Sequence, residues 1–265
     1  MKKIMFIICT LMMLMFGACG VKSDNEKNAD SPLSQQTQEN ATETKAADED
    51  TLSFEEIMAL EKQEVGVACG GYYDSVQEYC NQSKTRGRSI SLVEAEVVDA
   101  SYYVSKSNDG FIIYDMIIRN TSDEYNDFGL VSGDKIRVHH GVGRCYIALK
   151  KGQDAIDLER DALEIIKRDE VEYYKIPLKK KYIDSYVRAS DVDCETDIYL
   201  KTGEKYVFAF NSQIDFNGEN AYMWELGGYP INEEMLKGQI AAQSTYYVKI
   251  GKQIIDLIED EQKRD

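Results

Sequence analysis

The 265-residue sequence predicts a mainly β protein with added helices, of the α+β class, built on an antiparallel sheet. From Ser91 onward, apolar and polar residues alternate with the period of a half-buried strand. The turn Asn108-Asp109-Gly110 has the composition of a hairpin between two antiparallel strands. Helical spacing of apolar residues occurs in short segments near the two ends of the folded part and in one segment between strands.

The first 18 residues have the organisation of a secretory signal peptide. Two lysines precede an apolar run over residues 4–16, and Gly17-Ala18 come directly before Cys19. This arrangement resembles a bacterial lipobox, with Phe16 where most lipoboxes have leucine. The resemblance implies cleavage by signal peptidase II and lipidation of Cys19 with a fatty acid such as palmitate. We expect a lipid anchor on the extracytoplasmic face of the cell membrane; an ordinary secretory signal with an incidental cysteine is the alternative.

Residues 19–50 form a polar, acidic segment that has little to bury. Within residues 21–50, eight acidic residues stand against three lysines. This composition predicts a flexible tether, because burial cannot offset the entropy of ordering such a segment. Residues 51–265 are expected to form a single folded domain. That domain has thirteen more acidic than basic residues, which argues against a nucleic-acid partner, since phosphate binding needs a basic surplus.

The folded domain is predicted to begin with a helix. Ser53 and Glu56 have capping-box spacing, and apolar residues follow at helical spacing. The stretch from Gly66 to Gly87 predicts a loop with a short helix over residues 75–79.

The first long strand, over residues 91–104, changes phase in its middle. Its alternating apolar residues fall into two sets, Val93, Ala95 and Val97, and then Val98, Ala100, Tyr102 and Val104. A slip of one residue inside a strand is typical of a β-bulge, which bends the strand.

The remaining pattern predicts further strands and three more helices. Strands are expected over residues 111–119, 135–140, 145–149, 206–210 and 222–226. Helices are expected from Asp154 to residue 168, from Asn232 as a short segment, and over 250–258 as an amphipathic C-terminal helix. Residues 173–197 carry no readable pattern. Alternation places Ile112, Tyr114, Ile136, Tyr206 and Phe208 in the interior, and Tyr222, Trp224 and Leu226 on one side of the last strand.

Four or five antiparallel strands, with a helix between the third and fourth strand regions, are typical of an oligonucleotide/oligosaccharide-binding (OB) barrel. The segments SLVEAEVVDASYYV, GFIIYDMIIRN, SGDKIRVHHGVG, LKTGEKYVFAFN and AYMWELGGYP also resemble a largely uncharacterised barrel module of secreted and lipid-anchored proteins in Gram-positive bacteria. That module is similar in outline to netrin-like, protease-inhibitor OB barrels. The resemblance covers about residues 88–230 and implies an OB-like barrel core, but it brings no catalytic residue.

Four cysteines remain beyond the anchor: Cys69, Cys80, Cys145 and Cys194. An even number outside the cell permits two disulfides in any of three connectivities. We favour Cys69–Cys80, which closes a short loop beside a glycine-rich turn, with Cys145–Cys194 as its complement. Buried thiols are the alternative. No Cys-x-x-Cys spacing supports a zinc site, so no metal is expected.

The two histidines do not form a catalytic pair in the predicted sheet. Alternation places His139 outward and His140 on the opposite face, where it is expected to be a hydrogen-bonded core or rim residue. Cys145 lies close to His140 in sequence, and such a pair could activate a thiolate, but no third orienting group is identifiable. The chain has no Gly-x-Ser-x-Gly and no His-Glu-x-x-His motif. We therefore assign no catalytic residue and no cofactor.

The expected function is that of a binding or interaction module held at the membrane by its lipid anchor, with an unknown protein or envelope ligand as its partner. Eighteen tyrosines favour this interpretation, since tyrosine is common at recognition surfaces. A cell-envelope hydrolase and the solute-binding component of a transporter are the alternatives. The latter normally alternates strands and helices across two lobes, which this strand-rich sequence does not.

Overall fold

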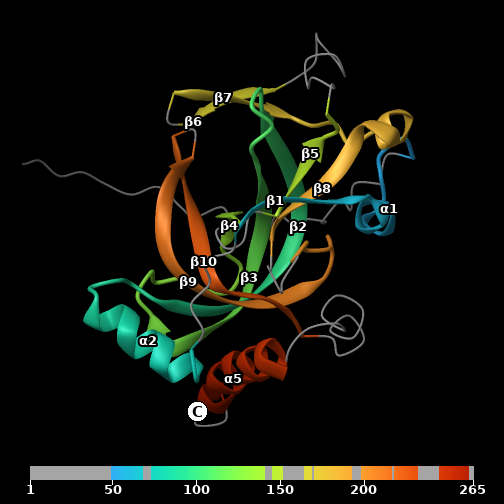
Figure 1. The fold of residues 1–265 in the computed structure, drawn as a ribbon. Helices are drawn as coiled ribbons and strands as arrows, with labels where there is room; N and C mark the ends of the chain where they lie inside the picture. Colours follow the sequence, from blue (N-terminus) through green and yellow to red (C-terminus); the bar gives the residue numbers. More distant parts are fainter. Residues whose placement is uncertain are drawn as a thin grey trace, which may run out of the picture. The chain divides into compact units, whose positions relative to one another are not determined.

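A computed structural model describes residues 49–67, 73–140, 145–151, 164–168, 170–192, 198–216, 218–231 and 245–262. These residues belong to one compact unit, Ala47–Asp265, and they are mainly β, as predicted (Figure 1). The helices are α1 (Phe54–Ala59), α2 (Val76–Thr85), the 3-10 helix η1 (Lys180–Ser185) and α5 (Thr245–Gln262). The strands are β1 (Lys62–Val67), β2 (Ser91–Ser105), β3 (Gly110–Asn126), β4 (Lys135–His139), β5 (Tyr146–Leu149), β6 (Ile165–Arg168), β7 (Val171–Lys175), β8 (Tyr186–Val192), β9 (Lys205–Phe216) and β10 (Glu219–Pro230).

Two sheets organise these strands. The larger has the order β3-β4-β10-β9-β2-β7-β6, and β2 also pairs with β3. Its pairs are antiparallel except β4 with β10, which run parallel over three residue pairs. The smaller sheet has the order β1-β8-β5, with β1 parallel and β5 antiparallel to β8. Figure 1 shows the long strands β2, β3, β9 and β10 curving across the middle of the fold.

Strand β2 contains the predicted bulge. Val97 is paired with Met116 of β3, whereas the next register position pairs Asp99 with Asp115. Val98 is therefore the extra residue, and 46% of its surface is exposed. The bulge brings both apolar sets of β2 to the main core, apart from Val98 itself.

The predicted hairpin turn joins β2 to β3. Asn108 adopts a positive φ of 66°, which asparagine tolerates better than most residues. Its side-chain amide donates to the Leu149 carbonyl oxygen (2.8 Å), and its side-chain oxygen accepts from the Leu149 N–H (2.9 Å). The turn is thus connected to β5 as well as to its own strands.

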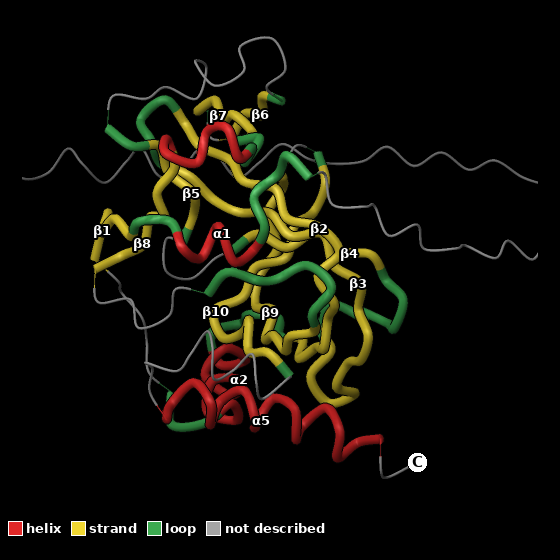
Figure 2. Tube along the Cα trace, turned by 90° about the vertical axis from the view of Figure 1, so that its right-hand side faces the viewer, coloured by secondary structure: helices red, strands yellow, loops and turns green. Residues whose placement is uncertain are grey.

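Three buried clusters stabilise the fold. The main cluster contains all five residues predicted to lie inside, and each is at most 8% exposed: Ile112, Tyr114, Ile136, Tyr206 and Phe208. A second cluster packs α2 and α5 against β9 and β10, and these helices lie together at one end of the strands (Figure 2). Gln253 of α5 accepts a hydrogen bond from the backbone N–H of Val76 at 2.8 Å. A third cluster joins β2, β3, β6, β9 and β10.

The structure corrects two expectations. The helix predicted to end at residue 168 is wrong at its end, because Ile165–Arg168 forms β6 and pairs antiparallel with β7; residues 152–163 lie outside the described residues. Leu226 does not share a side with Trp224. Register shifts in β10 place Leu226 in the second cluster and Trp224 in the main one. The short helix predicted from Asn232 also lies outside the described residues.

Candidate functional site

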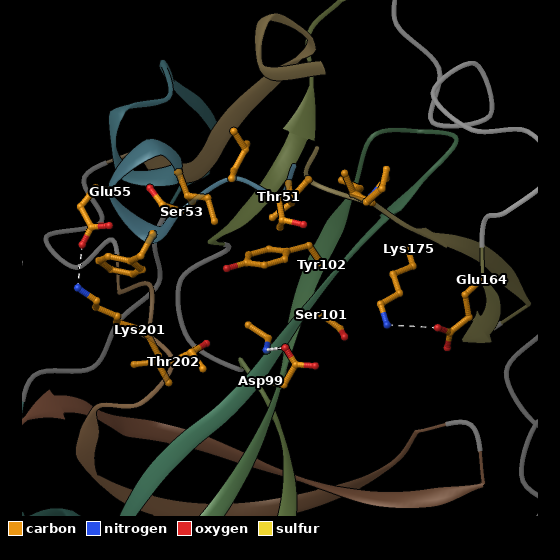
Figure 3. Close-up of a pocket in the computed structure, with 18 residues that line it drawn as sticks. Thr51, Ser53, Glu55, Asp99, Ser101, Tyr102, Glu164, Lys175, Lys201 and Thr202 are labelled. Carbon is orange, nitrogen blue, oxygen red and sulfur yellow. Dashed lines mark hydrogen bonds and ion pairs between the residues drawn. The ribbon is translucent and has the colours of Figure 1, made fainter. Parts of the chain in front are cut away.

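A cleft with a volume of about 650 Å³ lies beside the bulge of β2. Four segments line it, together with Glu164: residues 51–57 around the start of α1, residues 99–102 of β2, residues 175–178 after β7, and residues 200–202 before β9 (Figure 3). The lining residues are thus far apart in sequence and meet around the middle of one strand.

The cleft lies where one edge of β2 has no described strand beside it. On this edge, β9 pairs with β2 as far as Glu96, and β7 pairs with it from Tyr103 onward. Backbone hydrogen bonds mark the two margins. Val97 accepts from the Gly203 N–H (2.8 Å) and donates to the Glu204 carbonyl (3.1 Å), and the Tyr102 carbonyl accepts from the Ile176 N–H (2.8 Å). The other edge of β2 pairs with β3 throughout. Residues 98–101 therefore face an interruption in the sheet.

The inner wall of the cleft is apolar and well packed. Its buried members are Leu52, Ile57, Tyr102, Ile176, Leu178 and Leu200. The wall next to α1 is held in place by a hydrogen bond from Leu52 N–H to the Leu178 carbonyl (2.8 Å). The capping box predicted from Ser53 and Glu56 is present and begins α1 at this wall. Such walls give a ligand a preformed surface.

Two ion pairs stand on opposite sides of the cleft, as Figure 3 shows. The Lys201 ammonium lies 2.7 Å from the Glu55 carboxylate, and the Lys175 ammonium lies 3.3 Å from that of Glu164. The hydrogen bond from Lys201 lowers the pKa of the Glu55 carboxyl. Between the two pairs, the Asp99 carboxylate accepts the Ala100 N–H at 2.8 Å.

Tyr102 places a buried phenol in the cleft. Its side chain reaches across the cleft from β2 (Figure 3), and the residue is only 7% exposed. Its hydroxyl forms no hydrogen bond with any part of the chain that the structure describes. Burial raises the pKa of Tyr102 well above its usual value, and the negative charge of Asp99 adds to this rise. The group is therefore a neutral phenol, able to donate one hydrogen bond and to accept others.

Neither histidine takes part in this cleft. The His140 ring nitrogen Nε2 lies 3.1 Å from the Ile198 carbonyl oxygen, and the ring packs edge-on against Trp224, so the expected hydrogen-bonded core histidine is confirmed. The outward position predicted for His139 is wrong. It is 6% exposed because the β6–β7 hairpin covers this face, and its Nε2 lies 2.6 Å from the Arg168 guanidinium.

The described cysteines are buried thiols and lie apart. Cys80 belongs to the second cluster and Cys145 to the main one. Burial raises the pKa of the Cys80 thiol to about 12, which makes it a poor nucleophile. Cys69 and Cys194, the partners favoured from sequence, lie outside the described residues, so both pairings stay predictions.

The sequence-predicted lipidation site is separate from the described part of the chain. Cys19 and the tether up to residue 48 lie outside the described residues. None of the helices in the described ranges has the length and apolar character needed to cross a membrane. No cluster of three or more side chains suited to metal binding occurs in the described ranges.

Sequence reasoning identified the bulge but did not single out Asp99 or Tyr102 as site residues. The phase slip at Val98 was the available signal, since bulges occur often beside binding sites. Comparison with known proteins finds no match to a protein-family model, to a curated protein or to a solved structure. The cleft itself is therefore the basis for any statement about function.

Proposed function

We propose that this chain is a lipid-anchored binding protein of the extracytoplasmic membrane face, and that the cleft beside β2 is its ligand-binding site. The lipobox-like sequence ending at Cys19 supports the anchor, and the acidic residues that follow support a tether. The partner is then a small ligand from the cell envelope or its surroundings rather than a nucleic acid.

The scaffold in this proposal is an OB-like barrel over about residues 88–230. The support comes from the strand pairings: β2, β3, β4, β10 and β9 each pair with the next, and β9 pairs back with β2. Five strands in such an order suit a Greek-key barrel of the OB type. The weakest pairing is the short parallel contact between β4 and β10, where OB-type barrels are often partly open.

The observation that carries the binding function is the unpartnered phenol in an apolar cleft. The Tyr102 hydroxyl has no hydrogen-bond partner among the described residues, so it can donate one hydrogen bond to a ligand in the cleft and accept others. Apolar walls with a few placed polar groups are typical of small-molecule sites, and about 650 Å³ lies within their usual range.

A variant that fills the cleft tests this proposal. Ala100 lines the cleft, whereas Val98, two residues away on the same strand, does not. The full chain and its Ala100→Phe and Val98→Phe variants would be incubated with an envelope extract from the producing cell and weighed by native mass spectrometry. We expect a bound small molecule on the wild type and on Val98→Phe, and none on Ala100→Phe.

Circular dichroism would establish that the Ala100→Phe variant keeps the β content of the wild type. Tyr102→Phe provides a second, milder change, because it removes only the hydroxyl, and it is expected to reduce the bound fraction. Equal occupancy of the same ligand on all four proteins would show that the cleft is not the site.

A further inference from the structure

The cleft reaches the edge of β2 as well as one of its faces. Residues 99–102 line it in an unbroken run, although successive side chains of a strand point to opposite faces. A cleft over a single face would be lined by alternate residues instead. Figure 3 shows this stretch of β2 crossing the cleft, and Ala100 and Ser101 are only half-buried. The backbone of the stretch is therefore open to the cleft from the side.

Ala100 directs its backbone N–H and C=O into the interruption of the sheet. Both groups of one strand residue point to the same edge, and those of the next residue point to the other edge. The Ser105 N–H donates to the carbonyl of Asp109, beside the start of β3, whereas the Tyr102 carbonyl accepts from Ile176 on the interrupted edge. Ala100 is two residues from Tyr102 and so shares that edge.

No strand partner takes up these two groups of Ala100. Its N–H is bonded to the carboxylate of its own neighbour, Asp99, at 2.8 Å. Among the described residues, no group donates to the Ala100 carbonyl on this edge. One residue of β2 thus offers a donor and an acceptor side by side, which is the pair that an antiparallel strand uses. Such an unpaired stretch of sheet edge is a template for an added strand.

We infer that the cleft binds a short peptide, which lies antiparallel to β2 and pairs with Ala100 through one N–H and one C=O. This inference rests on the proposed function and adds the chemical class of the ligand. Strands β9 and β7 both run antiparallel to β2 on this edge, one on each side of the interruption. A peptide between them continues the same pattern of pairing.

The length of the interruption suits a peptide of three residues. Val97 and Tyr102 make the last backbone bonds on its two sides. The five steps of extended chain between them span about 16 Å, and three peptide residues span about 10 Å. The segments 200–203 and 175–178 close the two ends. A short peptide with both termini nearby therefore fits better than the middle of a long chain.

The apolar wall favours an apolar side chain at the centre of the peptide. Directly opposite residues of an antiparallel pair place their side chains on the same face. The side chains of Ala100 and Tyr102 pack on the main cluster, which also supplies Leu52 and Leu200 of the cleft wall. The peptide residue opposite Ala100 then turns its side chain toward this wall, where leucine would bury apolar surface.

Four uncharged peptides test the pairing: N-acetyl-Ala-Leu-Ala-amide and its three forms with one N-methylated residue. Their dissociation constants for the full chain would be measured by titration calorimetry. An antiparallel pair uses the N–H of the leucine opposite Ala100, whereas the N–H groups of both alanines point away from β2. We expect the N-methyl-leucine form to bind about 10-fold more weakly than the parent, and the two N-methyl-alanine forms to bind about as tightly as the parent.

Variants of the chain test the other side of the pairing. Ala100→Phe should abolish binding of the parent peptide, and Val98→Phe should keep it. Asp99→Ala should bind the parent peptide about 3-fold more tightly, because the Ala100 N–H no longer has an internal acceptor. Asp123→Ala is the matched control: it removes a carboxylate that does not line the cleft, and it should bind as the wild type does.

The outcomes separate this inference from the proposed function. The strand pairing is overturned if the three methyl groups have equal effects, if an alanine methyl group weakens binding more than that of leucine, or if Asp99→Ala and Asp123→Ala bind alike. It is also overturned if no peptide binds. In each case the cleft remains a binding site if Ala100→Phe still removes the ligand taken from the envelope extract. If Ala100→Phe changes neither peptide binding nor that ligand, both proposals are overturned.

Discussion

Replacing His139 with glutamine is expected to remove a pH-dependent part of the stability. The imidazole is buried against Phe111 of the third cluster, with the two ring centres 5.0 Å apart. Its Nε2 lies 2.6 Å from the Arg168 guanidinium, and its Nδ1 has no hydrogen-bond partner among the described residues. Burial, and then the positive charge of Arg168, lower the pKa of His139 to about 3.

The sign and size follow from this shift. A pKa lowered from the ordinary histidine value of 6.5 means that the unfolded chain binds more protons than the folded one between about pH 3 and 6.5. The free energy of unfolding therefore falls as the pH decreases through this window. The decrease in the free energy of unfolding that is due to His139 is negligible at pH 7 and amounts to about 2 kcal/mol at pH 5. It approaches its limit of about 5 kcal/mol around and below pH 3.

Urea unfolding at pH 7 and pH 5 would measure this difference for the wild type and His139→Gln. The glutamine oxygen can accept the Arg168 hydrogen bond but does not titrate. We expect the wild type to lose about 2 kcal/mol more than the variant on acidification. NMR of the two imidazoles gives an independent measurement, in which the His139 signals should not move between pH 7 and 4.5. Equal losses in both proteins, or a His139 titration near pH 6.5, would refute the reasoning.

Three further outcomes are expected. Cys19→Ser should leave the precursor unprocessed and without radiolabelled palmitate; normal processing and membrane retention of this variant would contradict the lipobox assignment. In the native wild type at pH 8, the buried Cys80 thiol should resist alkylation by iodoacetamide, as followed by peptide mass spectrometry, and should react in urea. Asn108→Ala should lower the free energy of unfolding by about 2 kcal/mol, because the variant loses both bonds to Leu149 and keeps a positive φ; a urea midpoint equal to that of Ser107→Ala, in the same turn, would contradict this.

Local sequence signals predicted the elements whose causes are local. The capping box of Ser53 and Glu56 depends on residues three apart, and the hairpin at Asn108 depends on turn chemistry. Alternation identified the buried faces of β3 and β9, because side chains on successive strand positions point to opposite faces. These predictions needed no knowledge of distant partners.

Elements whose form depends on distant partners escaped prediction. Strand β1 is paired in parallel with β8, more than a hundred residues away, and neither has a clear alternating pattern. Residues 165–168 are a different case: they pair with β7, which follows them directly, but their apolar spacing also suits a helix, so the pattern did not distinguish the two. His139 has the alternation of an exposed residue and is buried only because the β6–β7 hairpin covers it.

The candidate site connects the two kinds of feature. The phase slip at Val98 is visible in the local sequence. In the structure it is a β-bulge, which shifts the register of β2 against β3 and bends the strand. On one side of the slip β2 pairs with β9, and on the other it pairs with β7, with the interruption between them. The segments from α1, β7 and residues 200–202 then enclose a cleft there rather than continue the sheet. Because residues 99–102 follow Val98 and line the cleft, the stretch of β2 that leaves the sheet pairing on this edge is also the stretch that the cleft exposes to a ligand.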